Sequence, residues 1–489
     1  MNIMNKRQDG GENFEKYQGE EGEAQADYYR KINMNSIHDD STDYLSRNSD
    51  KILSAMPSDT FCTLPWIHVN STVSGLYRPC CNSNARFQFD GKDTDVRVHL
   101  KSFKEVFYGE DMNRIRQQML NNERPPECSV CYNNEDAGLS SYRQDYNRRE
   151  NKFLPLVEKD LTPKLKYLDI KFDNKCNLQC RMCDPGSSDQ HWEGIEYYVQ
   201  NNLEFSDHMK PMTTFFRHDK DNVLGRLEDI NKMKNRKYYQ DLKNKYISDN
   251  LNDVSILKVT GGEPFISKDF LEILDLAIEK NYAKNIHLSI TTNGSKFIKK
   301  YLEKFTFFKT VDFNISIDGT EKIYDYIRYP FSWNNINERL NGLLTFIEDY
   351  KLTGKIRARL SCLVQAYNWL NLGDIDFYFE ELSSKYSWLD LNGLDYNFNL
   401  FPEKSELHAK YLPKHLLELG VENFLKMAPL NRQVKDIEHF AQKYLKIDDE
   451  EHKQKRLKQM TVTYDKMRKQ QYNDYMPKEF NTWLDGIKI

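Results

Sequence analysis

Residues 165–183 read Leu-Lys-Tyr-Leu-Asp-Ile-Lys-Phe-Asp-Asn-Lys-Cys-Asn-Leu-Gln-Cys-Arg-Met-Cys, and this stretch decides the fold. Its first half alternates apolar and polar side chains up to Phe172, which predicts a half-buried strand. Three cysteines follow directly, Cys176, Cys180 and Cys183, with the spacing C-x-x-x-C-x-x-C. Parallel α/β barrels carry their chemistry in the loops that follow their strands. The cysteine loop is therefore the first candidate site.

The three cysteines suit an iron–sulfur cluster better than a zinc ion. Three thiolates can hold three irons of a [4Fe–4S] cluster, and the fourth iron then stays open to a chelating ligand. The alternative is a zinc knuckle, but structural zinc normally takes four ligands, often from two CxxC-like pairs. No fourth Cys or His lies within this loop. We therefore predict a cluster with one open iron here.

From Leu165 to about Leu400 the pattern of strand, loop and helix repeats. Such alternation predicts parallel βαβ units and an α/β fold. Six units fit a partial (β/α)6 barrel better than a complete eightfold barrel. The strand candidates are Leu165–Phe172, Ser255–Thr260, Ile286–Thr292, Val311–Ile317, Ile356–Val364 and Leu394–Leu400, and examples of the helices between them are Phe270–Ile278, Ile336–Ile347 and Ile375–Leu382.

The predicted strands alternate instead of running continuously apolar. In the first strand Leu168 and Ile170 fall on one face, and Asp169 and Lys171 fall on the other. Covering helices need the apolar face, so the polar face points into the barrel. Because unpaired buried charges are costly, the interior either holds a polar ligand or satisfies itself as an ion-pair network. The other members of the polar set are Ser289, Thr291, Asn293, Asp312, Asn314, Ser316, Asp318, Arg357, Arg359, Ser361, Asn397 and Asn399.

The region from Leu165 to Leu400 resembles the radical S-adenosylmethionine (radical SAM) superfamily. The segment Cys-Asn-Leu-Gln-Cys-Arg-Met-Cys matches the superfamily signature in spacing, and its place after a strand makes the match specific. The resemblance implies that the cluster at Cys176, Cys180 and Cys183 chelates S-adenosyl-L-methionine. One position departs from the pattern, because an aromatic residue often precedes the last cysteine and here it is Met182. A thioether contact is expected to replace the aromatic contact with adenine.

Further motifs follow the later strands. Gly261-Gly262-Glu263-Pro264 comes after the second strand, as in the family's motif for the methionyl amine. Glycines permit close backbone approach, and a carboxylate accepts hydrogen bonds from an ammonium. The resemblance also implies that Ser316 meets the ribose, that Arg328 meets the methionyl carboxylate, and that Asn293 lines the cofactor site. A surface salt bridge is the alternative for Arg328.

A second cysteine set precedes the barrel. Cys62 is followed by Gly75 and Cys80, and later by Cys128-x-x-Cys131. The pattern resembles the cysteine spacing of SPASM and twitch auxiliary-cluster domains in their four-cysteine form, although it lies before the barrel instead of after it. The resemblance implies a second, auxiliary [4Fe–4S] cluster on these four cysteines. Four thiolates also suit a structural zinc site, which spacing alone does not exclude.

Two further cysteines need an interpretation. Cys81 lies beside Cys80, and either could be the true ligand; the family spacing of glycine plus five favours Cys80. Cys362 falls on the apolar face of the fifth predicted strand, which predicts a buried core thiol.

The resemblance implies a reaction as well as a cofactor. The reduced cluster would cleave S-adenosylmethionine to methionine and a 5′-deoxyadenosyl radical, which abstracts hydrogen from a substrate; iron–sulfur clusters reach the low potentials that this needs. A flavodoxin or ferredoxin is the expected reducing partner. A fully ligated second cluster would suit a net oxidation. Asp169 and Asp318, together with Asp312, are candidate general bases by strand face alone.

The sequence indicates the substrate less clearly than the cofactor. Relatives with such an auxiliary domain modify peptides, proteins, aminocyclitols or a nucleotide, and the polar lumen argues against a lipid. We predict oxidative modification of a peptide or protein, with dehydrogenase-type oxidation of a polar small molecule as the alternative. A non-catalytic zinc-binding protein is the rival from another class. A methyltransferase is disfavoured, because no Rossmann glycine loop is apparent.

Composition sets the broad class. The 489 residues carry a net charge of −4 with nearly balanced acids and bases, which gives no electrostatic case for nucleic acid or an anionic membrane as a partner. The first residues lack the apolar stretch of a signal peptide, and no run of eighteen apolar residues occurs. We therefore expect a cytoplasmic protein whose nine cysteines stay reduced.

Four regions are predicted along the chain. Residues 1–57 are polar and read as a flexible tail, and residues 58–150 read as the small cysteine-rich domain with one helical stretch, Phe103 to Leu120. Residues 160–402 form the barrel, and residues 184–250 are a helical insertion that is either a lid over the barrel mouth or a plain surface feature. Residues 403–489 read as helices, with Val434, Ile437, Ala441, Tyr444 and Leu445 at helical spacing.

Overall fold

The computed structural model describes residues 56–83, 87, 97–136, 141–150, 162–209, 216–234, 240–389, 393–398, 405–428, 434–446 and 450–488. Apart from its last two residues, the predicted polar tail, residues 1–57, lies outside this range. So does the end of the last predicted strand, at Leu400.

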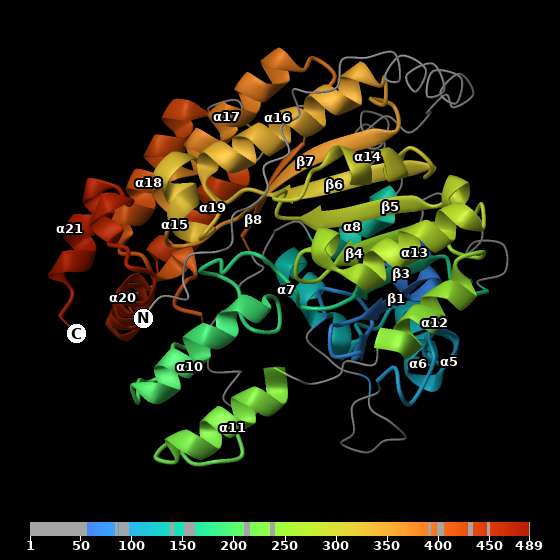
Figure 1. The fold of residues 1–489 in the computed structure, drawn as a ribbon, viewed down its shortest axis with the longest axis horizontal. Helices are drawn as coiled ribbons and strands as arrows, with labels where there is room; N and C mark the ends of the chain where they lie inside the picture. The colour runs from blue at the N-terminus through green and yellow to red at the C-terminus, as the bar shows by residue number, and fades with distance from the viewer. Residues whose placement is uncertain are drawn as a thin grey trace.

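One mostly parallel sheet of eight strands organises the molecule (Figure 1). The strands lie in the order β2-β1-β3-β4-β5-β6-β7-β8, and every neighbouring pair is parallel except β1 with β2. With the helices between the strands, this is an α/β fold consistent with a partial barrel. The strands are β1 (His68–Ser71), β2 (Tyr77–Arg78), β3 (Tyr167–Lys171), β4 (Ile256–Thr260), β5 (His287–Thr292), β6 (Thr310–Ser316), β7 (Ile356–Leu363) and β8 (Leu394–Asn397).

The six predicted strands are confirmed as β3 to β8. The sheet, however, has eight strands instead of the six that were predicted. β1 and β2 come from the N-terminal cysteine-rich segment, and β1 pairs with β3 in the register His68 to Tyr167. β1 is four residues long and buried at every position, so it lacks the alternation that identified the others. Its partner lies about a hundred residues away, which no local pattern indicates.

Helices between the strands bury their apolar faces against the sheet. α13 buries Phe270, Ile273, Leu274 and Ala277, which fall one turn apart, and Ser267 caps its first turn through the Phe270 N–H. The connecting helices are α13 (Lys268–Glu279), α14 (Lys299–Phe305), α15 (Glu321–Ile327), α16 (Trp333–Asp349) and α17 (Leu372–Lys385), with short 3-10 turns at Pro264–Ile266, Ala283–Asn285 and Trp369–Asn371.

The two faces of the strands differ as the alternation predicts. In β7 the side chains alternate strictly between buried and half-buried, and Cys362 is fully buried, as expected for a core thiol. On the other face Asp312 Oδ1 accepts from Arg357 Nε at 2.7 Å. The side chains of Arg359 and Lys171 make no hydrogen bond or ion pair with the described residues, although the charge of Arg359 acts on the nearby Asp312. The inner face is therefore partly self-paired and partly open.

The insertion after β3 contains three helices, α10 (Trp192–Gln200), α11 (Val223–Lys234) and α12 (Gln240–Asn250). α10 and α11 pack on each other around a small core of their own, which includes Trp192, Tyr198 and Phe205. Figure 1 shows these two helices apart from the sheet, whereas α12 packs against α13. Whether the insertion acts as a lid stays a prediction.

The flanking regions are helical and share the main core with the sheet. The single helix predicted from Phe103 to Leu120 is wrong, because it divides into two; Gly109 caps the second helix, and a side chain there would meet the Glu105 carbonyl at 2.7 Å. The predicted C-terminal helices are confirmed. No helix of the described part could cross a membrane. These helices are α4 (Leu64–Ile67), α5 (Phe103–Phe107), α6 (Glu110–Leu120), α7 (Ser129–Asp136), α8 (Tyr142–Arg149), α18 (Lys414–Met427), α19 (Val434–Leu445), α20 (Glu451–Arg468) and α21 (Lys478–Gly486), with 3-10 turns at Pro126–Cys128, Asp189–His191, Ala409–Tyr411 and Tyr472–Asp474.

Candidate active site and cysteine pocket

The cysteine loop after β3 lies directly on the glycine turn after β4. The N–H of Gly262 donates to the Asp173 carbonyl at 3.0 Å, and the N–H of Glu263 donates to the Lys175 carbonyl at 2.7 Å. A Cβ added at Gly262 would lie 2.1 Å from that Lys175 oxygen. Gly261 has φ +140°, which favours glycine. The two glycines thus let the turn approach the backbone of the cysteine loop.

Glu263 joins this turn to the end of β5. Its carboxylate accepts from Thr292 Oγ1 at 2.7 Å, from the Asn293 N–H at 2.7 Å and from the Phe265 N–H at 3.3 Å. The side chain is 1% exposed, and this burial raises the pKa of Glu263 to about 7 despite the three donors. Glu263 is therefore close to half-ionised near neutral pH.

Asn293 connects Glu263 to the cysteine loop. Its Nδ2 lies 3.7 Å from Cys176 Sγ and donates to Asn177 Oδ1 at 3.2 Å. Ser295 Oγ reaches the same Asn177 oxygen at 3.1 Å. The residues predicted from the strand ends after β3, β4 and β5 are thus brought together at one edge of the sheet.

The three thiols of the loop lie close enough to influence one another. Burial, and next to it the charge of Cys180, raises the pKa of Cys176 to about 12. A hydrogen bond between Cys180 and Cys183 raises the pKa of Cys183. Three thiols this close to one another ionise together only beside a cationic centre, which is what a metal site supplies. This donor set fits the cluster that the sequence predicts.

The spacing of the thiols bears on the kind of metal site. Across the described ranges, no three Cys, His, Asp or Glu side chains converge as a single metal ion requires. Tetrahedral zinc–thiolate bonds of about 2.3 Å would bring the sulfurs to within about 3.8 Å of one another. A four-iron cube holds them farther apart, because each thiolate binds a different iron. Bound iron and zinc, measured per chain, distinguish the two kinds of site.

Arg328 and Asp318 form a buried ion pair beside the thiols. Arg328 Nε donates to Asp318 Oδ2 at 2.8 Å, and the other carboxylate oxygen accepts from the Leu363 N–H at 2.8 Å. Their exposed fractions are 7% and 0%, so the alternative of a surface salt bridge is wrong. Burial raises the pKa of Asp318, while Arg328 acts to lower it. Arg328 also interacts electrostatically with Cys180 and Cys183.

The two remaining predicted cofactor residues also lie at this end of the sheet. Ser316 ends β6 and stands opposite Ser361 in β7, with its side chain half-buried on the inner face. Met182 is half-buried and packs against the main core. Asn293 continues the inner face of β5 and corresponds in register to Ser316.

The C-terminal helix α20 reaches the cysteine loop, which sequence reasoning missed. Arg181, between Cys180 and Met182, is fully buried, forms an ion pair with Asp465 and lies 3.6 Å from the ring centre of Tyr326. Arg468 donates to the Gln179 carbonyl. These contacts span more than 280 positions of sequence, and no motif in α20 marks them.

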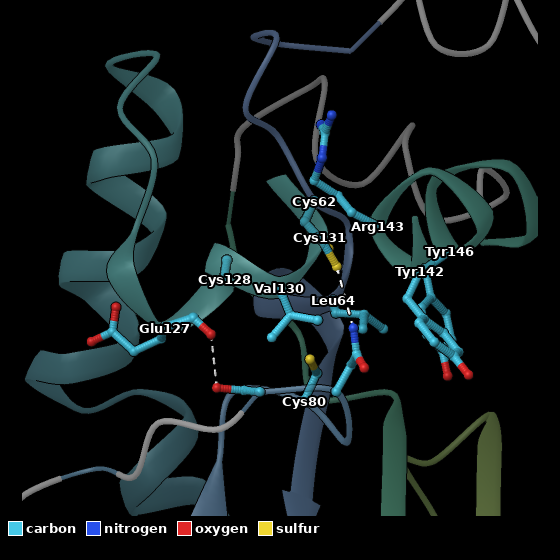
Figure 2. Close-up of a pocket in the computed structure, with 12 residues that line it drawn as sticks. Cys62, Leu64, Cys80, Glu127, Cys128, Val130, Cys131, Tyr142, Arg143 and Tyr146 are labelled. Atoms are coloured by element: carbon cyan, nitrogen blue, oxygen red, sulfur yellow. Dashed lines mark hydrogen bonds between the residues drawn. The ribbon is translucent and has the colours of Figure 1, made fainter. Parts of the chain in front are cut away.

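The second cysteine set lines one pocket of about 380 Å³ that opens to solvent. Cys62, Cys80, Cys128 and Cys131, all predicted ligands, contribute to its wall (Figure 2). They come from four places: the residue before Thr63 and α4, the turn after β2, the 3-10 turn before α7, and α7 itself. Burial raises the pKa of Cys62 to about 12, and neighbouring thiols act in the same direction.

Cys80 and Cys81 point to different surroundings. Cys80 lines the pocket, whereas Cys81 does not. Instead Lys258 Nζ, on the inner face of β4, lies 3.4 Å from Cys81 Sγ, and it also lies 3.2 Å from Asp169 Oδ2. Burial acts to raise the pKa of Asp169, but Lys258 and His68 hold it well below its usual range.

Comparison with known proteins identifies part of the chain. Residues 170–348 match the family model described as the Radical SAM superfamily, from β3 into α16. This match shows a radical SAM domain over that segment. No curated protein matches the chain.

Solved structures of Streptococcus suis SuiB are similar over part of their length. SuiB bound to S-adenosylmethionine matches at 15% identity and a TM-score of 0.30, over 66% of this chain and 60% of that chain. A second structure of SuiB matches at 14% identity and a TM-score of 0.30, over 66% of this chain and 57% of that chain. SuiB bound to its precursor peptide SuiA matches at 16% identity and 0.26, over 57% and 49%. The matched region thus spans 60% or less of these solved chains.

Proposed function

We propose that this chain is a radical SAM enzyme that holds a [4Fe–4S] cluster on Cys176, Cys180 and Cys183 and abstracts hydrogen from a polar substrate. One observation carries the proposal. The three-cysteine loop at the end of β3 closes against Gly261 and Gly262 at the end of β4, inside the segment that matches the radical SAM family. A zinc knuckle would need neither the glycine turn nor an open coordination position.

The cluster and S-adenosylmethionine, when bound, supply a 5′-deoxyadenosyl radical. The chain's own residues position the site. Glu263 offers a carboxylate to the methionyl ammonium, and Arg328 has donors beyond those used by Asp318 for a carboxylate. Asn293 and Ser316 supply polar groups from the inner face. The buried pair Arg181–Asp465 closes the outer side of the loop against water.

We further propose that the pocket formed by Cys62, Cys80, Cys128 and Cys131 holds a second cluster with four protein ligands. The support is that four thiols from separate elements line a single pocket. Their burial makes free thiolates costly, and metal ligation offsets that cost. A cluster that is fully ligated accepts an electron without binding substrate, which suits a net oxidation.

The general base stays a prediction at both candidate positions. Asp169 is ionised, but its depressed pKa makes it a weak base. Asp318 has both oxygens engaged, by Arg328 and by the Leu363 N–H. Either residue would have to exchange a partner to accept a substrate proton.

The polar inner face supports a polar substrate. The side chains of Arg359 and Lys171, which make no hydrogen bond or ion pair with the described residues, offer donors to such a substrate. A peptide or protein remains the predicted class, with oxidation of a polar small molecule as the alternative. A flavodoxin or ferredoxin remains the predicted reductant.

The proposal is tested by purifying the protein without oxygen and measuring iron, sulfide and zinc per chain. We expect about eight irons, from two four-iron clusters. On addition of dithionite and S-adenosylmethionine, 5′-deoxyadenosine should form, as measured by liquid chromatography. Zinc without iron at both cysteine sets would instead support the non-catalytic zinc-binding protein and end the proposal.

A further inference from the structure

Lys258 links the cysteine pocket to the inner face of the sheet. Its ammonium lies 3.4 Å from Cys81 Sγ, 3.3 Å from Tyr146 Oη and 3.2 Å from Asp169 Oδ2. Tyr146 itself lines the pocket. A flexible lysine is thus held at one point by a thiol, a phenol and a carboxylate.

The turn that carries Cys80 is fixed from a second direction. His68 Nδ1 lies 3.2 Å from the Pro79 carbonyl oxygen, and His68 Nε2 lies 3.8 Å from Asp169 Oδ2. Asp169 and His68 are both 1% exposed. The Pro79–Cys81 turn is therefore held between His68 and Lys258, and both of these meet the same carboxylate.

The position of this ammonium has an electrostatic consequence. One-electron reduction adds a negative charge to a cluster, and a fixed positive charge nearby stabilises that reduced form. Cys81 follows Cys80 directly, so the ammonium lies one residue from a proposed ligand. Water screens it little, because its side chain is 17% exposed.

We propose that Lys258 raises the reduction potential of the cluster in the cysteine pocket, as a positioning residue that acts through Cys81 and Tyr146 and is not itself a ligand. This rests on the proposed function, which places a cluster on Cys80 and its three partners. The carboxylate of Asp169 opposes the effect, since it carries the opposite charge at the same point.

The test measures the midpoint potential of the auxiliary cluster alone. The full-length Cys176→Ala/Cys180→Ala/Cys183→Ala protein serves as the parent, and a dye-mediated redox titration is followed by electron paramagnetic resonance. Lys258→Met should lower the potential, and Lys258→Arg should keep it near that of the parent. Asp169→Asn should raise it. The double variant Lys258→Met/Asp169→Asn should shift less than Lys258→Met alone.

A matched control separates this local effect from a general loss of charge. Lys304 pairs with Asp275 on the outer helices, so Lys304→Met also removes the lysine of a Lys–Asp pair. It should leave the potential unchanged. Iron and sulfide content, measured on every variant, show that the same cluster is being titrated.

Opposite shifts from Lys258→Met and Asp169→Asn distinguish electrostatics from a structural role. An unchanged or raised potential in Lys258→Met overturns the inference. If the Lys258→Met variant fails to hold iron, the midpoint potential of the Asp169→Asn variant decides the question. An unchanged or lowered potential in Asp169→Asn overturns the inference. A parent protein without iron would refute the auxiliary cluster itself, and this inference with it. If the parent holds iron but neither the Lys258 nor the Asp169 substitution shifts its midpoint potential, only the role of Lys258 is refuted.

Discussion

Glu263 shows how one side chain can organise the site. Its three hydrogen bonds hold the ends of β4 and β5 together, and Asn293, one of its partners, reaches Cys176. A carboxylate has about four acceptor positions, so three internal donors leave room for one ligand donor. The burial that makes this arrangement rigid also makes ionisation costly, which is why its pKa rises to about 7.

The first prediction concerns the pH dependence of cofactor binding. Below about pH 7 Glu263 is protonated and neutral, and above it the carboxylate can pair with the methionyl ammonium. The dissociation constant for S-adenosylmethionine should therefore fall, by about tenfold, between pH 6 and pH 8. Equilibrium dialysis of the labelled cofactor against anaerobic, cluster-loaded protein measures it. Glu263→Gln should bind weakly at both values, and an equal affinity of the unmodified protein at both would contradict the assignment.

Local motifs made some residues of the site predictable. The cysteines and Gly261–Glu263 follow predicted strands, and parallel strand ends meet at one edge of a sheet. No local motif marks the other residues of the site. The spacing from Gly75 favours Cys80 over Cys81 only through the family resemblance, and no local pattern shows that these neighbouring residues face different surroundings. No pattern in the sequence indicates that Arg181 is buried, since its partner Asp465 lies 284 positions away.

The same distinction holds for the elements. β3 to β8 were predictable because each alternates apolar and polar side chains over at least four residues of sequence. β1 and β2 were missed because both are short and their pairing is non-local. The predicted helix from Phe103 to Leu120 overlooked a break at Gly109, where backbone crowding excludes a larger residue.

Helix α12 fastens the N-terminal strand pair to the end of β3. Lys243, fully buried, donates to the carbonyls of Thr72, Val73, Lys171 and Phe172 at 2.9 to 3.2 Å. The first two follow β1, and the last two lie where β3 leads into the cysteine loop. The Lys243 ammonium thus shares its three N–H donors among four carbonyl oxygens at the edge where the site lies.

We predict that Lys243→Met lowers the free energy of unfolding by about 2–4 kcal/mol, because within the described residues it leaves the buried Val73 carbonyl without a donor and removes one donor from three other carbonyls. Lys245→Met is the matched control on the same helix. Lys245 forms an exposed pair with Asp249, and its loss should cost no more than about 0.5 kcal/mol. Urea denaturation of both variants measures the difference. Equal stability of the two would show that α12 does not fasten the strands.

At the scale of the whole molecule, three of the four predicted regions are not packed as separate bodies. These are the cysteine-rich segment, the barrel and the C-terminal helices. The N-terminal segment adds strands to the sheet, and α20 contributes Asp465 and Arg468 to the cysteine loop. The main core includes residues from all three, such as Phe61, Leu257 and Phe480. Composition and periodicity do not report such packing, and the predicted boundaries near residues 150 and 402 stay predictions.

The two cysteine sets nevertheless occupy separate places. One lies in the loop after β3, and the other lines a pocket made by residues from Cys62 to Tyr146. We assign the cleavage of S-adenosylmethionine to the first cysteine set only. Removing that set should therefore abolish cleavage and leave the other iron in place.

The most direct test is the Cys176→Ala/Cys180→Ala/Cys183→Ala protein, purified without oxygen and compared with the unmodified chain. We predict that its iron content falls by about half, from about eight to about four per chain. The formation of 5′-deoxyadenosine on reduction should fall to background. Cleavage of S-adenosylmethionine at the unmodified rate by this triple variant would contradict the central claim.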